Sequence, residues 1–154
     1  MKILVTGAAG FIGSKTVDVL HDLGHDVISI DNESAISNEK FYWHKEVRGW
    51  KHDICDAGAI DAVFAYYKPD AVMHCAAQAR IQIGYNSPLD TYNTNYIGTV
   101  TLLEACVEHK CKRFVFASTS SSYGLANDIP LREDYETDCL TPYSISKVAA
   151  GKAC

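Results

Sequence analysis

Residues 2–13 have the sequence KILVTGAAGFIG, an apolar run followed by a turn with three evenly spaced glycines. The run predicts a buried strand over Lys2–Thr6, and the turn opens a predicted helix. A strand, a glycine-rich turn and a helix in this order can hold phosphate, because the helix N-terminus supplies free N–H groups and positive partial charge. Gly7 suits the tight turn, Gly10 the approach of a pyrophosphate, and Gly13 close packing of the helix on the strand.

The glycine spacing is G-x-x-G-x-x-G, which differs from the commoner dinucleotide fingerprint G-x-G-x-x-G. A glycine pattern alone also occurs in ordinary tight turns between a strand and a helix. The flanking strand and helix favour cofactor binding over that alternative. The predicted cofactor contacts of the turn are Gly7, Gly10, Phe11, Ile12 and Gly13.

Apolar runs alternate with longer amphipathic stretches along the rest of the chain. The predicted strands are Lys2–Thr6, Asp26–Ile30, Gly49–Asp53, Ala71–Cys75 and Arg113–Ser118. The predicted helices are Phe11–Leu23, Ala57–Tyr67, Leu89–His109 and a last one that begins near Pro142. This alternation predicts an α/β fold: a Rossmann-type, doubly wound parallel sheet with helices on both faces. One dinucleotide-binding domain is expected over residues 1–154, with Asn32–Arg48 as an irregular insertion.

Composition limits the classes of partner. The net charge is −5, which argues against nucleic acid or an anionic membrane as the main partner. No apolar run approaches the roughly 18 residues of a membrane span, and the N-terminus shows no signal-peptide cleavage region. The six cysteines form no C-x-x-C pair and no zinc spacing, so no metal site is predicted. Scattered thiols indicate a reducing compartment, the cytoplasm.

Acidic residues follow the second and third predicted strands. The carboxylate of Asp31 can accept hydrogen bonds from an adenosine ribose and repel a 2′-phosphate, which favours NAD over NADP. A solvated acid at a strand end is the alternative. Asn32, and not an arginine, comes next in the sequence. Asp53 and Ile54 are predicted to frame the adenine, although an Asp after a strand also commonly caps a helix.

Tyr143 and Lys147 stand four residues apart in TPYSISK, residues 141–147. In a helix, positions four apart share a face, so the phenol and the ammonium would project side by side. Such a pair can act as an acid and base at neutral pH. A surface Tyr and Lys at helical spacing is the alternative. His74, in a predicted buried strand, is expected to be a hydrogen-bonded core residue and not a catalytic base.

The motifs occur in a characteristic order: TGAAGFIG at 6–13, Asp31, HDI at 52–54, HCAAQ at 74–78, NYIGT at 95–99, ASTSSSYG at 117–124 and PYSISK at 142–147. Together they resemble the extended short-chain dehydrogenase/reductases, in the nucleotide-sugar epimerase and dehydratase branch, over essentially the whole chain. The resemblance implies NAD as cofactor and a nucleotide sugar, of the UDP-sugar kind, as substrate. It also implies a C-terminal sugar-nucleotide lobe, which is not expected within these 154 residues, so the chain alone should turn over little or no substrate.

The resemblance also implies roles for single residues. Its catalytic positions fall on Thr119, Tyr143 and Lys147. Its further cofactor contacts fall on Ala76, Ala77, Gln78, Asn95, Tyr143 and Lys147, with Asn95 organising the active site. A free tyrosine titrates near pH 10, but Lys147 and an oxidised nicotinamide would stabilise the tyrosinate and lower its pKa. Tyr143 would then take a proton while hydride leaves the same sugar carbon, and return of hydride to the opposite face of the 4-keto sugar would invert that carbon.

The residues after Thr119 bear on the choice of reaction. Dehydratases of the family carry an acidic residue one or two places further on, where this chain has Ser120 and Ser121. This difference favours 4-epimerisation, while dehydratase, decarboxylase and reductase activities stay open as alternatives. A non-catalytic, NAD-binding regulatory module is an alternative from another class.

The resemblance further implies a homodimer. In the family, the helices that carry Asn95 and Tyr143 pack against the same helices of a second subunit. An apolar stripe on the first helix is the predicted contact: Leu102, Leu103, Ala105 and Cys106.

Overall fold

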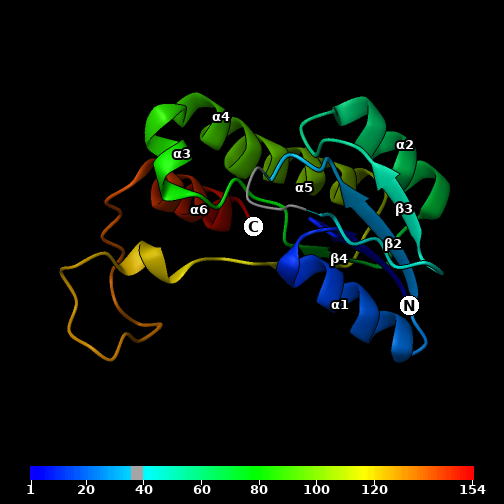
Figure 1. The fold of residues 1–154 in the computed structure, drawn as a ribbon, viewed down its shortest axis with the longest axis horizontal. Helices are drawn as coiled ribbons and strands as arrows, with labels where there is room; N and C mark the ends of the chain where they lie inside the picture. The colour runs from blue at the N-terminus through cyan, green and yellow to red at the C-terminus, as the bar shows by residue number, and fades with distance from the viewer. Residues whose placement is uncertain (36–39) are drawn as a thin grey trace.

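The computed structural model describes residues 1–35 and 40–154. Five parallel strands form one sheet in the order β3-β2-β1-β4-β5, with helices on both of its faces (Figure 1). The predicted α/β, doubly wound class is therefore confirmed. The strands are β1 (Lys2–Thr6), β2 (Asp26–Asp31), β3 (Arg48–Lys51), β4 (Ala71–His74) and β5 (Arg113–Phe116).

Alternate residues of the strands supply two separate cores. On one face, Leu4 and Val72 pack with residues of α2 (Ala57–Tyr67) and α5 (Gly98–Glu108). On the other face, Val5 packs with Val17 of α1 (Phe11–Asp22). The inner strands β1, β2 and β4 read as nearly continuous apolar runs because both faces of the sheet are covered there, whereas the edge strands β3 and β5 are more exposed.

Three predicted strands end earlier than their apolar runs suggest. The sequence placed the ends at Asp53, Cys75 and Ser118, but β3, β4 and β5 end two, one and two residues sooner, at Lys51, His74 and Phe116. One backbone hydrogen bond to the neighbouring strand follows the end of β4 and of β5, from Cys75 to Thr6 and from Ala117 to His74, both at 3.1 Å, and beyond them the chain leaves the sheet. Asp53 and Thr119 consequently lie in loops and not at strand ends.

The predicted helix Leu89–His109 is interrupted. It consists of α4 (Pro88–Tyr92), the π-helical turn η1 (Asn93–Ile97) and α5. The N–H of Gly98 bonds to the carbonyl of Asn93, five residues earlier, which widens the turn. Such wide turns often occur at functional sites. Asn95 lies in this one.

A short helix before α4 was not predicted from the sequence. Helix α3 (Ile81–Asn86) has only Gly84 among its buried residues, so it has no apolar periodicity to detect. Gly84 lies where a β-carbon would be 3.7 Å from the backbone nitrogen of Tyr143. α3 thus supports the start of the last helix, α6 (Pro142–Ala153).

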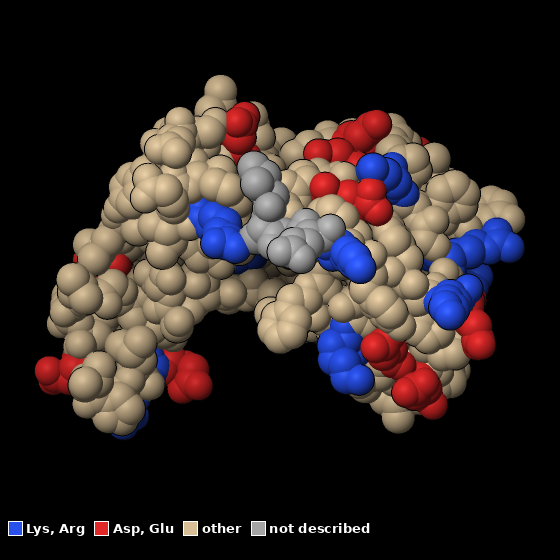
Figure 2. Space-filling model, in the orientation of Figure 1, with Lys and Arg blue, Asp and Glu red and all other residues tan. Residues whose placement is uncertain are grey.

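The segment between the 3-10 helix η2 (Ser120–Tyr123) and α6 projects away from the sheet (Figure 1). We call residues 124–141 the arm. The carboxylate of Asp138 accepts hydrogen bonds from the backbone N–H groups of Leu125 and Ala126, both at 3.1 Å, and ties the two ends of the arm together. In the space-filling view, a hollow separates the arm from the body of the molecule (Figure 2). None of the described helices combines the length and the apolar character that a bilayer crossing requires.

Candidate active site

A cavity of about 240 Å³ opens at the carboxyl ends of β1 and β4, where the strand order reverses direction. Open parallel sheets bind ligands at this point. Most of the predicted cofactor contacts line it: Gly7, Gly10, Phe11, Ile12, Gly13, Asp31, Asn32, Ile54, Ala76 and Ala77. The sequence did not single out six other lining residues: Ile30, Ser34, Ala35, His52, Cys75 and Thr94. Most of these flank predicted contacts, so adjacency was the available signal.

The turn after β1 forms the floor of the cavity. Gly7 has φ +66°, and a β-carbon there would lie 2.7 Å from the backbone nitrogen of Ala76. A β-carbon on Gly13 would collide with the carbonyl oxygen of Gly7. The backbone therefore approaches itself so closely that only hydrogen fits at these two positions. The N-terminus of α1 is left facing the cavity, where it can receive an anion.

Asp31 is the last residue of β2 and holds the turn from the side. Its carboxylate accepts hydrogen bonds from the backbone N–H of Ala9, at 3.1 Å, and of Glu33, at 2.7 Å. Next to it, the amide of Asn32 donates to the carboxylate of Asp53 at 2.8 Å. Partial burial works to raise the pKa of Asp53, but hydrogen bonds from the Cys55 backbone and from Asn32 outweigh it and lower that pKa. Asp53 acts on the cavity through Asn32, since it does not line the wall itself.

Asn95 connects the segment after β4 with the last helix. Its side chain is buried, accepts a hydrogen bond from the N–H of Gln78 at 2.7 Å, and donates to the carbonyl of Gln78 at 3.1 Å. It also donates to the hydroxyl of Ser146 at 3.0 Å, and that hydroxyl donates to the carbonyl of Tyr143 at 2.7 Å. Gln78 and Asn95 are thus brought together beside the cavity, where they fix the first turn of α6.

Tyr143 lies in that first turn. Thr141 caps α6 by accepting a hydrogen bond from the N–H of Ser144 at 3.0 Å, and the Ser144 hydroxyl accepts one from the N–H of Thr141 at 3.1 Å. This capping box and Pro142 at the first helical position define where the helix starts. Tyr143 is half-buried and Lys147 is buried one turn later, so the predicted helical spacing is present.

Thr119 caps η2 and does not end a strand. Its hydroxyl oxygen accepts a hydrogen bond from the N–H of Ser121 at 3.1 Å. The following residues, in η2, contact α6, and the carbonyl of Ser122 accepts a hydrogen bond from the N–H of Asp138 in the arm at 2.8 Å. Thr119 is half-buried and its hydroxyl hydrogen is available to a ligand.

Lys147 is 2% exposed, and its ammonium lies 3.9 Å from the centre of the Phe116 ring. The ion pairs found among residues 1–35 and 40–154 do not involve it. Burial lowers the pKa of Lys147 from its ordinary value to about 8. A cation–π contact of this kind partly compensates a buried charge, so the lysine stays protonated at neutral pH.

The chain is also similar in sequence to known proteins. Residues 3–154 match the model of the family described as "NAD dependent epimerase/dehydratase family". The chain belongs to this family. The resemblance inferred from the ordered motifs is therefore confirmed at family level.

Similar proteins within the epimerase/dehydratase family include UDP-glucose 4-epimerase of Halalkalibacterium halodurans, 38% identical over 99% of this chain and 45% of that protein. Solved structures include UDP-glucose 4-epimerase of Thermotoga maritima with UDP-glucose, with a TM-score of 0.92 and 35% identity. The Thermus thermophilus UDP-glucose 4-epimerase complex with NAD gives 0.91 and 33%. Both structural matches cover 99% of this chain and 49% of the other. The chain spans about half the length of the curated relatives it matches.

The lowered pKa of Lys147 predicts a specific pH dependence of stability. Between about pH 8 and 10.5 the unfolded chain binds this proton and the folded chain does not. The free energy of unfolding of the wild type should therefore rise with pH in this window, relative to Lys147→Met. Urea unfolding of both proteins from pH 6.5 to pH 10 measures the difference. Groups that do not interact with Lys147 titrate alike in both proteins and cancel, so two parallel curves would contradict the assignment.

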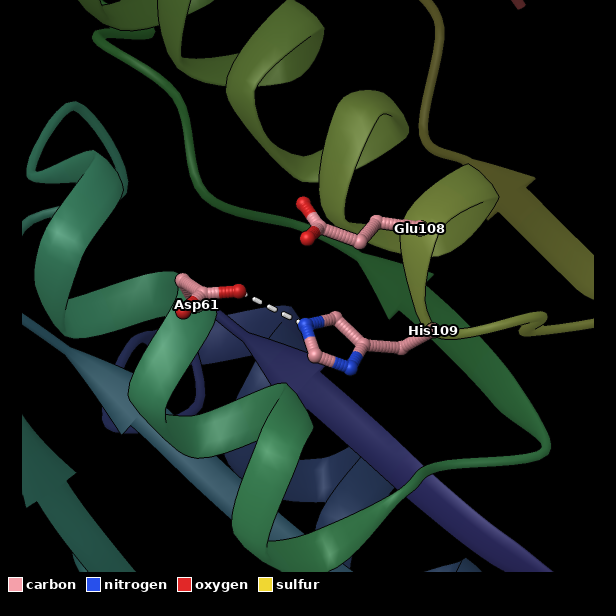
Figure 3. Close-up of side chains that lie close together, drawn as sticks. All are labelled: Asp61, Glu108 and His109. Carbon is pink, nitrogen blue, oxygen red and sulfur yellow. Dashed lines mark hydrogen bonds and ion pairs between the residues drawn. The ribbon is translucent and has the colours of Figure 1, made fainter.

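One group of three possible metal ligands occurs among the described residues, far along α5 from the cavity. Asp61, Glu108 and His109 converge between α2 and α5 (Figure 3). His109 and Asp61 pair with each other at 2.7 Å, and both carboxylates are exposed. We interpret the Asp61–His109 pair as a surface contact between two helices, because exposed acidic groups commonly cluster without a bound metal ion.

Proposed function

We propose that the chain is the cofactor-binding and catalytic-residue part of an NAD-dependent nucleotide-sugar 4-epimerase. The main support is the Asn95 side chain, which joins Gln78 beside the cavity to the turn of α6 that carries Tyr143. Similar proteins are named UDP-glucose 4-epimerases, so UDP-glucose is the substrate we propose. We assign residues 1–154 the role of an NAD-binding Rossmann domain, and place a sugar-nucleotide lobe outside this range.

The residues fit the cofactor. The glycine turn and the N-terminus of α1 would receive the pyrophosphate, and Asp31 would accept the adenosine ribose hydroxyls. Asn32, Asp53 and Ile54 would border the adenine. When bound, NAD supplies reversible hydride transfer. Ala76, Ala77 and Gln78 would lie along the nicotinamide half.

The chain's own groups would handle the proton. Lys147 carries its positive charge in a desolvated position, where it would stabilise negative charge that develops on the Tyr143 oxygen and would bind the nicotinamide ribose. Tyr143 would accept the proton of the sugar's 4-hydroxyl and later return it. Thr119 would donate its free hydroxyl hydrogen to the same sugar oxygen. The hollow between the arm and the body of the molecule is where we place the sugar (Figure 2).

An activity assay on the complete protein that contains these residues tests the proposal. With NAD and UDP-glucose, the C4 epimer should form until the two sugars reach equilibrium, as followed by NMR. Deuterium placed at C4 of the sugar should stay there, because hydride is returned from the same cofactor. A protein that binds both NAD and UDP-glucose yet forms no epimer would sink the enzyme assignment.

Asp31 is expected to set the preference for NAD. Asp31→Asn keeps an oxygen for the Ala9 N–H but removes the charge that repels a 2′-phosphate. The ratio of the NADP to the NAD dissociation constant should fall by about tenfold or more, which corresponds to roughly 1.4 kcal/mol. Calorimetric titration with both cofactors measures this ratio. Asp26→Asn, at the exposed start of the same strand, is the matched control and should leave the ratio unchanged.

A homodimer through α5 and α6 is also proposed, on a different face from the one expected. Leu102, Ala105 and Cys106 of the predicted stripe are buried in the chain's own core. The outward stripe on η1 and α5 is instead Tyr96, Val100, Leu103 and Val107. Val107 is 81% exposed, and Ile145 on α6 is 44% exposed. Sedimentation equilibrium should show a dimer that Val107→Glu weakens; a strict monomer at high concentration contradicts this part.

We place the protein in the cytoplasm. All six cysteines are free thiols, among them the buried Cys106. Unpaired thiols in this number suit a reducing compartment.

A further inference from the structure

A buried chain of hydrogen bonds crosses the sheet between the cavity and η1. The N–H of Ala76 donates to the hydroxyl of Thr6 at 3.3 Å, and that hydroxyl lies 2.6 Å from Nδ1 of His74. On the other side of the ring, Nε2 lies 3.0 Å from the hydroxyl of Thr99, which donates to the carbonyl of Asn95 at 2.7 Å. Thr6, His74 and Thr99 are fully buried.

The two ends of this chain fix the position of every proton in it. A hydroxyl carries one hydrogen, and that of Thr99 is used on the Asn95 carbonyl, so Nε2 of His74 must donate to Thr99. A backbone N–H can only donate, so Thr6 accepts from Ala76 and directs its own hydrogen to Nδ1. All groups are satisfied by one species, the neutral imidazole with its hydrogen on Nε2.

The surroundings keep His74 neutral. Burial, and then the charge of Lys147, lower the pKa of His74 to about 3. The ring packs against Phe114 and Phe116, at centroid distances of 5.7 Å, and Phe116 is also the ring that Lys147 contacts. A second positive charge here would face the lysine across one aromatic ring.

The far end of the chain reaches the wide turn that carries Asn95. Thr99 binds the main-chain carbonyl of Asn95, while the side chain of Asn95 holds Gln78 and Ser146. The main-chain carbonyl and the side-chain amide of Asn95 are therefore both hydrogen-bonded, and rotation of the turn would break both sets of hydrogen bonds. Because Ser146 bonds to the carbonyl of Tyr143, the position of Asn95 is transmitted to α6.

We propose that Thr6, His74 and Thr99 are positioning residues: through one defined imidazole tautomer they fix η1, and thereby hold Asn95 between the cofactor cavity and the turn that carries Tyr143. The catalytic consequence rests on the proposed function, whereas the tautomer and the placement of Asn95 do not. Ordinary core packing would need a buried side chain of this size but no particular position for its proton.

NMR tests the placement without any assay. In protein labelled with ¹⁵N in its histidine rings, the His74 signals, assigned by their loss in His74→Gln, should show a protonated Nε2 and an unprotonated Nδ1. Thr99→Val, which keeps the volume but removes the hydroxyl, should shift these signals and those of the Asn95 side-chain amide. Thr99→Ser should restore them. A protonated Nδ1, or an Asn95 amide unchanged by Thr99→Val, overturns the proposal.

Kinetics of the complete protein test the consequence. Misplacement of catalytic groups by about 1 Å can cost as much as 100-fold, so kcat of Thr99→Val should fall by about tenfold to 100-fold, with KM for the nucleotide sugar little changed. Thr99→Ser should recover most of the rate. Thr91→Val is the matched control, because Thr91 is also fully buried and back-bonds to the Ser87 carbonyl but does not contact His74.

The outcomes separate the two proposals. Equal losses in Thr91→Val and Thr99→Val mean a general cost of removing a buried hydroxyl, and overturn the positioning role. If the wild type binds NAD but does not epimerise the sugar, the proposed function fails, and the NMR result on His74 and Asn95 still decides the placement. If Thr99→Val does not fold, the wild-type tautomer and the Thr99→Ser spectrum decide it.

Discussion

Tyr143→Phe is expected to lower the turnover of the complete protein by about 100-fold to 10,000-fold, the usual contribution of a positioned acid or base. The phenolic hydroxyl is the only group removed, and the ring can keep its half-buried place in the first turn of α6. NAD affinity should change little, because the glycine turn and Asp31 are untouched. Initial rates of epimerisation at saturating UDP-glucose, with calorimetric titration of NAD, measure both quantities.

A matched change elsewhere separates chemistry from folding. Tyr85→Phe removes the hydroxyl of an exposed tyrosine. This hydroxyl donates a hydrogen bond to the carbonyl of Leu140 at 3.4 Å, close to the start of α6. This variant should keep a rate within a few-fold of the wild type. If Tyr143→Phe keeps its turnover, the acid/base assignment is wrong. If the wild type has a second, non-enzymatic activity that Tyr143→Phe leaves intact, a regulatory NAD-binding module becomes the better description.

Gly13→Ala should be strongly destabilising. The added carbon would collide with the carbonyl oxygen of Gly7 and lie 2.6 Å from its carbonyl carbon. Neither atom can move without shifting the turn. The turn itself has no room to shift, because a β-carbon placed on Gly7 would already lie 2.7 Å from the backbone nitrogen of Ala76. Overpacking usually costs about 1–3 kcal/mol, and contact with backbone places this change at the upper end or beyond. Urea unfolding should show this loss, and NAD binding should be abolished.

Gly58→Ala is the control for that experiment. Gly58 lies in α2, where a β-carbon meets nothing closer than the Asp56 carboxylate at 3.6 Å. Alanine there should be neutral or stabilise by up to about 1 kcal/mol, because glycine is a poor helix former. Similar unfolding free energies for Gly13→Ala and Gly58→Ala would show that the turn tolerates a side chain, contrary to its geometry.

Sequence periodicity predicted the elements well and their ends less well. The strand β1 and helix α2 have the predicted bounds, because a glycine turn ends one and the Asp56 cap and Pro69 bracket the other. The ends of β3, β4 and β5 were set too late. A strand's own sequence does not show where its neighbouring strand stops, so the points at which β3, β4 and β5 stop pairing could not be predicted from it.

The site was predictable as a set of residues but not as a set of contacts. The glycine turn, Asp31 and the Ala76-Ala77 pair indicate a cofactor site by their order in the chain. The hydrogen bonds of Asn95 with Gln78 and of His74 with Thr6 join residues 17 and 68 positions apart, and the helix or strand propensity of single residues does not predict such contacts. His74 was correctly expected to be a satisfied core histidine, but its partners, Thr6 and Thr99, were not identified.

The start of α6 has a consequence for how this protein can diversify. Because Thr141, Pro142 and Ser144 define the first turn locally, the helical phase of Tyr143 and Lys147 does not depend on the length of the arm before Thr141. Residues can be gained, lost or exchanged before Thr141 while Tyr143 and Lys147 keep their orientation. On the proposed function, different sugars can thus be accommodated by changes within residues 124–140 without redesign of the catalytic chemistry.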